Sequence, residues 1–398
     1  MTSLDSTGSA FETFLEGAAM EASEFMADPE ASVLHVTMGD SSGLHAGHDT
    51  SSLVGAFCAA YLKAKTAEPT TADGKKIAYV PVLAMSRDDF NLVPQVTVLV
   101  QLAGLSEVDS SMIYMDDMDL DACQVEVVGQ GIDETLYKSK VTPLVEAMLA
   151  EDESMIDASV ATLLGGCILI DTSNLKAGRV DEDGNALPDK ATERDMAAFS
   201  ALVPFLPMSG SEMYEALTEA KMNYDWWMSL SSLEMLRYDY QEDSSNGRKF
   251  GISAVLLPFW DVMEKPMLYK ASCDFMSEKK LDTIMIMAYS FEPRMSRQIL
   301  FMSDNFEKLK ELTQAFARVG GHAQMDLVYA DMDVEECLGT KNCEAFQQFT
   351  VGFSRKEVLP LVVEAYREAG VSLVPERDDD GFYSDPTGKL QVPTKESS

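Results

Sequence analysis

The first feature of this chain that could do chemistry is an apolar run that ends on a single carboxylate. The run is Gly165-Gly166-Cys167-Ile168-Leu169-Ile170, and Asp171 follows it with small polar residues behind. The pattern predicts a buried strand over 168–171 that brings Asp171 to the rim of an open α/β sheet, where ligands usually bind. The alternative is a structural role in which Asp171 only caps a neighbouring helix.

More side chains with metal-binding chemistry lie in two other segments. His45, His48 and Asp49 belong to a Gly-rich loop over 39–52, and Asp116 and Asp117 end a short predicted strand. Carboxylates and imidazoles are residue types that hold divalent cations when they converge at one sheet edge. The alternative is that the His loop is a flexible, solvated segment without a ligand, as its glycines indicate.

The elements that must position these side chains alternate between strands and helices. We predict strands over 32–38, 77–85, 112–115 and 125–129. We predict helices over 53–65, 94–105, 142–149 and 156–164, preceded by an amphipathic helix within 1–30. Such alternation is typical of a parallel sheet with helices on its faces. His35 lies within the first strand and is expected to be a core or edge residue.

A second unit follows a polar stretch over 176–194 that carries Gly and Pro turn signals. Helices are predicted over 211–224, 231–238, 266–278, 306–319 and 357–369, and strands over 250–257, 283–291, 298–301 and 346–353. We therefore expect an N-terminal helical extension, an α/β domain, a linker, a second α/β domain and a mobile tail, at 1–30, 31–175, 176–200, 201–374 and 375–398.

Composition limits the functions that are possible. The 398 residues carry a formal net charge of -35, which makes binding of nucleic acid or of an anionic membrane improbable. No apolar run is long enough to insert into a membrane, and the acidic N-terminus resembles neither a secretory signal nor a transit peptide. The six cysteines are scattered, as in a protein with reduced thiols. We expect a cytoplasmic protein whose acidity could reflect solubility, a salt-rich cytoplasm or a basic partner.

Several segments resemble the DHH phosphoesterases in order along the chain, in the branch of exopolyphosphatases and prune proteins that is related to family II inorganic pyrophosphatases. The segments are LHVTMG at 34–39, YVPVL at 79–83, IYMDDMDL at 113–120, VEVVG at 125–129, LLGGCILIDTSN at 163–174, LRYDY at 236–240, FGISAV at 250–255 and SRKEVLPLVVEA at 354–365. The resemblance implies an N-terminal parallel-sheet domain, a smaller C-terminal α/β domain with a mixed sheet, and a cleft between them.

The resemblance also implies a chemistry for particular residues. Mn²⁺ or Mg²⁺ ions would be held by the first domain, with Asp116 and Asp171 at positions that match metal motifs. Arg355 and Lys356 match the phosphate-binding positions of the second domain. The lysine that relatives carry after an Asp-Tyr pair is Gln241 in this chain, and the nearby Arg248 and Lys249 could compensate for it.

The departures from the family pattern bear on activity. The Asp-His-His motif is absent, and the first motif aligns His48 and Thr50 with the two expected aspartates, with Asp49 between them. His45, His48 and Asp49 remain as candidate substitutes in a remodelled metal site. Because losing even a supporting group commonly weakens a metal site about 10–100-fold, the loss of several ligands together disfavours a standard two-metal hydrolase.

Three functions therefore remain open. The first is a pseudoenzyme that keeps the scaffold for binding a protein partner or for assembly. The second is a divergent metal-dependent hydrolase of polyphosphate, pyrophosphate or a nucleotide phosphoanhydride. The third is a sensor that binds a phosphate-containing small molecule without turnover. We expect little or no hydrolysis of pyrophosphate or short polyphosphate, and we identify no catalytic residue.

Overall fold

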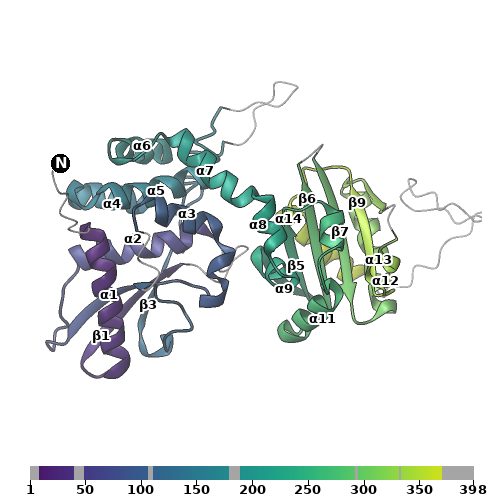
Figure 1. Cartoon of the computed structure of the whole chain (residues 1–398), viewed down its shortest axis with the longest axis horizontal. Coiled ribbons are helices and arrows are strands. Elements are labelled where there is room, and N and C mark those ends of the chain that lie inside the picture. Colours follow the sequence, from purple (N-terminus) through teal and green to yellow (C-terminus); the bar gives the residue numbers. More distant parts are fainter. Residues whose placement is uncertain are drawn as a thin grey trace, which may run out of the picture. The chain divides into compact units, whose positions relative to one another are not determined.

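The chain folds into two compact α/β units that divide after Asn223 (Figure 1). The computed structural model describes residues 9–39, 49–105, 111–178, 189–291, 295–330 and 333–369. The division lies beyond the segment 176–200 that was predicted as a linker. Helix α6 (Glu193–Leu202) begins within that segment, helix α7 (Gly210–Met222) follows it, and both contribute to the core of the first unit.

The first unit contains a parallel sheet in the order β2-β1-β3. Its strands are β1 (Ser32–Gly39), β2 (Lys76–Val82) and β3 (Gln124–Val128). Helix α1 (Ala10–Ala27) packs Ala22 and Phe25 against the apolar side chains of β1 and β2, which alternate along each strand. The strand predicted over 112–115 is reduced to one isolated bridge between Leu83 and Tyr114. The prediction of a parallel sheet in this unit is confirmed.

A layer of helices forms the larger core of the first unit. It consists of α2 (Thr50–Thr66), α3 (Pro94–Leu102), α4 (Thr142–Glu151) and α5 (Ala158–Asp171), together with α6 and α7. Helix α2 lies against β1 and β2 and also contacts α4 and α5. None of the helices in the described ranges is both long enough and apolar enough to cross a bilayer.

The strand predicted over 168–171 is wrong, because these residues are the end of helix α5. A continuous apolar run does not distinguish a buried strand from a helix that is buried on all sides. Two features of the element are those of a helix: Asp157 accepts a hydrogen bond from the Val160 amide as its N-cap, and α5 as a whole is 14 residues long. Gly166 serves close packing, since a Cβ atom there would lie 2.2 Å from Cδ2 of Leu99.

The second unit is built on a mixed sheet in the order β4-β5-β6-β7-β9-β8, as predicted for this part of the chain. Strands β5 and β6 are parallel and the other neighbours are antiparallel. The strands are β4 (Tyr240–Ser245), β5 (Arg248–Val255), β6 (Thr283–Ser290), β7 (Ser296–Ser303), β8 (Leu327–Tyr329) and β9 (Cys343–Gln348).

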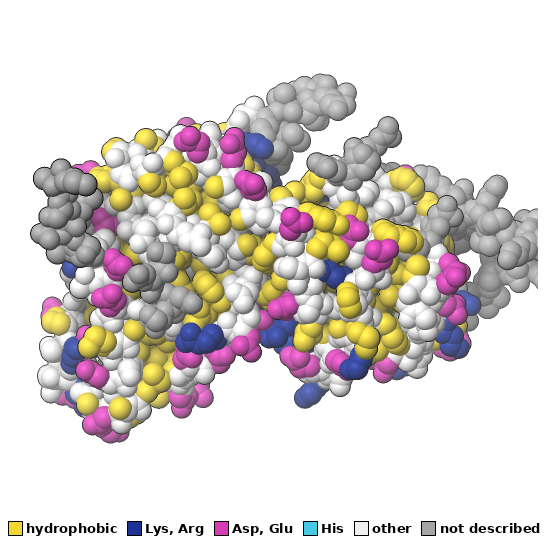
Figure 2. Space-filling model, viewed as in Figure 1, with side chains coloured by type: hydrophobic (Ala, Val, Ile, Leu, Met, Phe, Trp, Pro, Cys, Tyr) yellow, Lys and Arg dark blue, Asp and Glu magenta, His cyan; other side chains and the backbone are white. Residues whose placement is uncertain are grey.

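Helices α12 (Phe306–His322) and α14 (Arg355–Glu368) close the core of the second unit over one face of this sheet. The remaining helices are α8 (Tyr224–Ser229), α9 (Ser232–Tyr238), α10 (Phe259–Met263), α11 (Leu268–Lys279) and α13 (Val334–Leu338). On the face of the molecule shown in Figure 2, acidic side chains are scattered over both units and basic side chains lie among them.

Candidate functional site

Two of the carboxylates selected from the sequence lie where helices α2 and α5 meet. Asp49 is the N-cap residue of α2, and Asp171 is the last residue of α5. The Ser51 hydroxyl, in the first turn of α2, donates a 2.7 Å hydrogen bond to Oδ2 of Asp171. The two helix ends are therefore linked directly, although 120 residues separate Ser51 from Asp171.

The environment of Asp171 disfavours its charged form. Burial raises the pKa of this carboxyl to about 7, and the negative charge of Asp49 acts in the same direction. Hydrogen bonds from Ser139 and Ser51 and the charge of Lys140 oppose the shift. The Ser139 hydroxyl donates to the same Oδ2 atom at 2.6 Å. Asp171 thus binds two hydroxyl groups and keeps its proton to a higher pH than an exposed aspartate does.

Lys140 provides the positive charge of this cluster and was not selected from the sequence. Its ammonium lies 2.7 Å from Oδ2 of Asp49 and 3.2 Å from the Ser52 hydroxyl. Ser52 in turn donates to Oδ2 of Asp49 at 2.8 Å. The side chain of Asp49 is only 18% exposed, so this ion pair is partly shielded from solvent. We refer to Asp49, Ser51, Ser52, Ser139, Lys140 and Asp171 as the carboxylate–lysine cluster.

The segment that carries Ser139 and Lys140 is fixed by Asp195, which the sequence reasoning also missed. Asp195 lies in the first turn of α6 and is fully buried. Its carboxylate accepts hydrogen bonds from the amides of Lys138 and Ser139 and from the Thr142 hydroxyl. Burial opposes ionisation, but these hydrogen bonds outweigh it and lower the pKa of Asp195. The capping box Thr192–Asp195 at the start of α6 was the available sequence signal.

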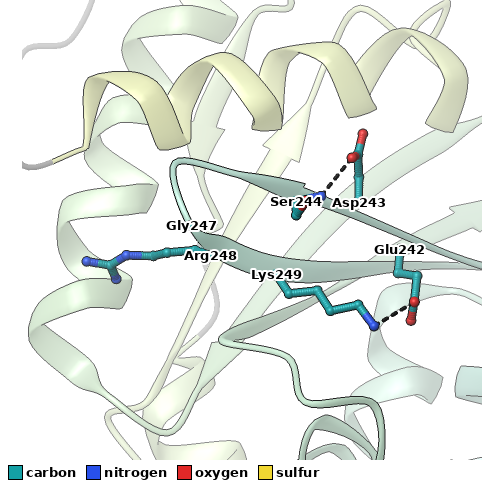
Figure 3. A pocket seen from close by; sticks show the side chains of 6 residues that line it. All are labelled: Glu242, Asp243, Ser244, Gly247, Arg248 and Lys249. Atoms are coloured by element: carbon teal, nitrogen blue, oxygen red, sulfur yellow. Dashed lines mark hydrogen bonds and ion pairs between the residues drawn. The ribbon is translucent and has the colours of Figure 1, made fainter.

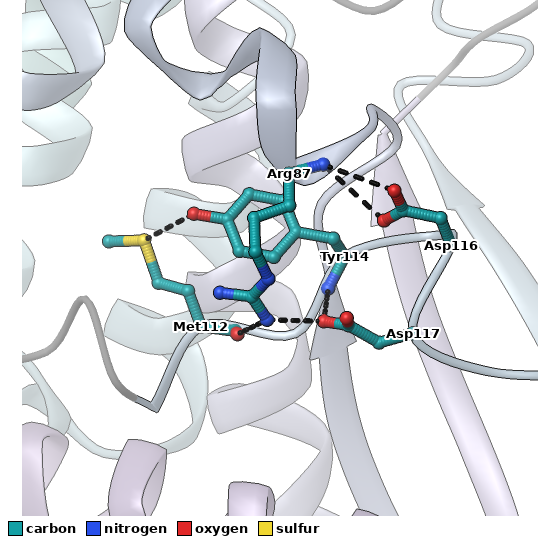
Figure 4. A network of polar contacts seen from close by, with 5 residues as sticks. All are labelled: Arg87, Met112, Tyr114, Asp116 and Asp117. Atoms are coloured by element: carbon teal, nitrogen blue, oxygen red, sulfur yellow. Dashed lines mark hydrogen bonds and ion pairs between the residues drawn. The ribbon is translucent and has the colours of Figure 1, made fainter.

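Asp116 lies in a separate network that is centred on Arg87 (Figure 4). It is exposed and accepts the Arg87 amide at 3.3 Å. The Arg87 guanidinium donates to Asp117 at 2.6 Å and stacks over the Tyr114 ring at 4.2 Å. No contact of the described residues joins Asp116 to Asp49 or Asp171. Arg87 thus ties the 3₁₀-turn Arg87–Leu92 to the 112–117 segment.

The histidines contribute little to the part of the site that the structure describes. His45 and His48 lie outside the described residues, so their convergence with Asp49 stays a prediction. His35 lies on β1, and its Nε2 atom is 3.9 Å from Glu126 on β3. In the described ranges, no group of three or more His, Cys, Asp and Glu side chains is placed to hold a metal ion.

The cations predicted in the second unit occupy different environments. Arg355 begins helix α14, is 4% exposed, and forms an ion pair with Asp239 at 2.7 Å. It also donates to the Asp239 carbonyl. Lys356, the next residue, is exposed, and no partner is seen for it within the described ranges. Glu357 accepts the Ser354 amide in a capping box at the start of the same helix.

Arg297 is a further cation at this end of α14 that sequence reasoning missed. It lies on β7, its guanidinium stacks over the Tyr289 ring at 4.2 Å, and it donates to the Phe353 carbonyl. Burial lowers the pKa of Arg297, opposed by the charges of Tyr289 and Glu357. Gln348, opposite Arg297 on β9, donates to the Phe353 carbonyl as well. Two partly or fully buried arginines therefore flank the first turn of α14.

Arg248 and Lys249 do not join these arginines. They lie at the turn end of the β4–β5 hairpin, whereas Asp239 and Arg355 lie at its opposite end. Five residues of extended chain separate Arg248 from Ser253, which corresponds to about 17 Å. The Lys249 ammonium pairs with Glu242, the residue after Gln241, and compensation for Gln241 by Arg248 or Lys249 stays a prediction.

A shallow hollow of about 430 Å³ accompanies these two cations (Figure 3). The side chains of Arg248 and Lys249 point in different directions from the strand, and the Lys249 ammonium pairs with Glu242 at 2.6 Å. Two carboxylates, Glu242 and Asp243, line the same hollow. This mixture of charges does not favour an anion over a cation.

The part of the chain that matches a known family model lies mainly in the second unit. The sequence profile described as "DHHA2 domain" matches residues 215–365. The chain contains a DHHA2 domain. This domain includes Asp239, Arg297, Arg355 and Lys356, and its match begins within α7, before the division between the compact units.

Three known proteins with similar sequences are described as "Exopolyphosphatase PRUNE1". The bovine protein (Bos taurus) is 25% identical over 391 residues, covering 84% of this chain and 76% of the relative. The human protein (Homo sapiens) is 23% identical with the same coverage. The rat protein (Rattus norvegicus) is 23% identical over 301 residues, and this chain spans only 61% of its length. The chain is a distant homologue of these proteins.

Two solved structures also resemble this chain. One is a putative family II inorganic pyrophosphatase from Methanococcus jannaschii, with a TM-score of 0.48 and 16% identity over 84% of this chain and 99% of that one. The other is an exopolyphosphatase-related protein from Bacteroides fragilis, with a TM-score of 0.27 and 10% identity over 88% of this chain and 96% of that one.

Proposed function

We propose that this DHHA2-domain protein has lost phosphoanhydride hydrolysis or retains it only weakly, and that it serves as a binding or assembly scaffold. The observation that carries the proposal is the state of the carboxylates in the first unit. Asp49 is engaged by the Lys140 ammonium, and Asp171 by two serine hydroxyls. Asp116 belongs to the separate Arg87 network.

This donor set does not fit the two-metal site that the resemblance implies. Mn²⁺ and Mg²⁺ prefer several carboxylate or imidazole ligands directed at one point. The described part of the cluster offers two carboxylates, and one of them already faces an ammonium group. A cation held between Asp49 and Asp171 would meet the repulsion of Lys140.

The test is a phosphate-release assay on the full chain with pyrophosphate or short polyphosphate, in Mn²⁺ or Mg²⁺. We expect no release above that of a heat-denatured sample. Robust hydrolysis that Asp171→Asn abolishes would contradict the proposal. Hydrolysis that persists unchanged in Asp171→Asn would point to a contaminating enzyme. The protein would then be purified further and the assay repeated.

A divergent metal-dependent phosphohydrolase is the second candidate, and the cations near α14 favour it. Arg297, Arg355 and the exposed Lys356 lie around the first turn of a 14-residue helix, whose free amides and dipole favour anions. Calorimetric titration with pyrophosphate distinguishes the possibilities. Binding that Lys356→Ala weakens, without turnover, would support a phosphate-binding protein instead of an enzyme.

The scaffold proposal includes a protein partner. The net charge of -35 would attract a basic partner at long range, and such a complex weakens as salt rises. A complex whose affinity stays constant between 50 mM and 500 mM salt would instead be held by apolar contacts. A cytoplasmic location is also part of this proposal.

A further inference from the structure

The carboxylate–lysine cluster contains the charges of a cation site together with a cation that belongs to the chain. Asp49 pairs with the Lys140 ammonium, and Asp171 accepts the hydroxyls of Ser51 in the first turn of α2 and of Ser139 next to Lys140. The ammonium lies 2.7 Å from Asp49, a normal distance for a charge-assisted hydrogen bond. The ammonium thus pairs with Asp49, and Asp171 is held beside this pair by two serine hydroxyls.

The stem of Lys140 is guided to this position by Gly129, just after β3. Gly129 has a φ angle of +82°, and a Cβ atom added there would lie 3.1 Å from Cδ of Lys140. A glycine at this point therefore allows both the backbone conformation and the close approach of the lysine stem.

The backbone next to Lys140 is fixed independently. Asp195 accepts the amides of Lys138 and Ser139 on one side, and the Thr142 hydroxyl on the other. Buried, fully hydrogen-bonded groups of this kind specify one backbone arrangement. Lys140 thus extends from a segment that is held on both sides, so its position is a property of the fold.

We propose that Lys140 is a built-in counter-ion that takes the place of a divalent cation between Asp49 and Asp171. Removal of its charge would convert the cluster into a site that binds Mn²⁺ or Mg²⁺. The inference rests on the loss of the two-metal site proposed above, but it concerns metal binding and not turnover. The two proposals can therefore be contradicted separately. Mn²⁺ binding can contradict the inference about Lys140 while the assay still shows no hydrolysis, and hydrolysis can contradict the proposed function whatever the variants bind.

The experiment compares Mn²⁺ binding by the full chain and its variants, after removal of metals with EDTA and dialysis into 150 mM salt. Free Mn²⁺ is measured by electron paramagnetic resonance during a titration. The variants are Lys140→Met, Lys140→Arg, Asp49→Asn and the double variant Asp49→Asn/Lys140→Met. Lys270→Met is the control, because it removes an exposed ion pair with Asp274 elsewhere in the chain.

We expect Lys140→Met to bind one equivalent of Mn²⁺ at least tenfold more tightly than the wild-type chain. The double variant should lose this equivalent, because Asp49 is a ligand of the converted site. Lys140→Arg and Lys270→Met should behave as wild type. Weak binding by the many surface carboxylates is common to all variants and cancels in the comparison.

Two results would overturn the inference. One is that the wild-type chain binds one equivalent of Mn²⁺ and Asp49→Asn does not. This result would overturn the inference whatever the Lys140 variants bind. The other is a folded Lys140→Met, shown by its far-UV circular dichroism, that binds no more Mn²⁺ than wild type. If Lys140→Met folds only when Mn²⁺ is added, its midpoint of thermal unfolding should rise with Mn²⁺ concentration, which supports the inference. If it remains unfolded at millimolar Mn²⁺, the metal does not replace the ammonium and the inference fails.

Discussion

The ammonium of Lys140 lies 2.7 Å from Oδ2 of Asp49, across 91 residues of sequence. The pair connects the N-terminus of α2 with the segment that precedes α4. Asp171 is linked to this pair by hydrogen bonds from two serine hydroxyls. Ser51 lies in the first turn of α2, after Asp49, and Ser139 is the residue before Lys140. Each candidate carboxylate of this cluster is therefore engaged by the chain itself.

Gly129→Ala tests how the lysine stem reaches Asp49. The variant places an L residue at φ +82° and a Cβ atom 3.1 Å from the stem of Lys140. The matched control is Gly131→Ala, where φ is +75° and nothing lies within 4 Å of the added Cβ. The backbone penalty, about 1–2 kcal/mol, should be common to both variants.

We expect Gly129→Ala to lower the free energy of unfolding more than Gly131→Ala does, with the excess lost when Lys140 is also changed to Ala. Urea unfolding followed by far-UV circular dichroism measures both effects. Equal losses in the two glycine variants would show that the stem adjusts without strain.

Asp195→Asn should destabilise the first unit more than any other single substitution considered for it. The carboxylate is fully buried and accepts three backbone amides and two hydroxyls, and the N–H groups of an Asn side chain would face some of these donors. Leaving buried donors unpaired costs about 1–3 kcal/mol each, so we expect a loss of about 2–4 kcal/mol. Asp274→Asn, at an exposed site, is the control.

The position of the tryptophans allows the unfolding of the second unit to be followed separately in Asp195→Asn. The chain has three, Trp226, Trp227 and Trp260, and all of them lie in the second unit. Circular dichroism reports both units, whereas tryptophan fluorescence reports the second. A loss in Asp195→Asn that is seen equally by fluorescence would mean that the two units unfold as one cooperative system.

Arg355 and Lys356 are neighbours in sequence that should respond differently to removal of their charge. Arg355→Met leaves the Asp239 carboxylate without its guanidinium partner, and the Asp239 carbonyl keeps only the Ala254 amide as a donor, so we expect a loss of about 1–3 kcal/mol. Lys356→Met changes an exposed side chain, for which effects usually stay within about 0.5 kcal/mol. Urea unfolding followed by tryptophan fluorescence compares them. Similar losses would contradict the structural role assigned to Arg355.

Some local sequence patterns predicted the secondary structure correctly and others did not. The strands over 283–291 and 298–301 were predictable as a hairpin because apolar runs flank a turn, and β6 and β7 are indeed antiparallel. The run before Asp171 was misassigned because a helix buried on all sides shows no amphipathic period. Strand β4 was missed because it is a polar edge strand, although Asn246-Gly247 is a strong hairpin signal.

The candidate site was only partly predictable for a different reason. Asp171 and Asp49 could be selected because their residue types and surrounding motifs carry the resemblance. Lys140, Ser139 and Asp195 have no motif of their own, and their roles depend on contacts across 32–91 residues of sequence. An ion pair of this kind exists only once the fold has brought the helix ends together, so no local pattern could have indicated it.

Glu344 offers a pH-dependent test in the DHHA2 domain. It lies half-buried on β9 and accepts a hydrogen bond from the Thr313 hydroxyl of α12. Burial raises the pKa of this carboxyl, opposed by that hydrogen bond and by the charge of Lys310. The folded chain therefore keeps the Glu344 proton to a higher pH than the unfolded chain does. The favourable contribution is complete below the unfolded pKa and is lost as pH rises through the folded pKa.

Glu344→Gln remains neutral at every pH and should not lose this contribution. We expect the free energy of unfolding of the variant, relative to wild type, to increase as pH rises above the unfolded pKa and to level off once pH exceeds the folded pKa. Urea unfolding followed by tryptophan fluorescence measures it, because the tryptophans lie in the same unit. Glu311→Gln, an exposed site on α12, should show no such change and controls for the removal of one negative charge. A difference that is constant with pH would mean that Glu344 is ionised as easily in the folded chain as in the unfolded one, and a difference that falls as pH rises would mean that it is ionised more easily in the folded chain.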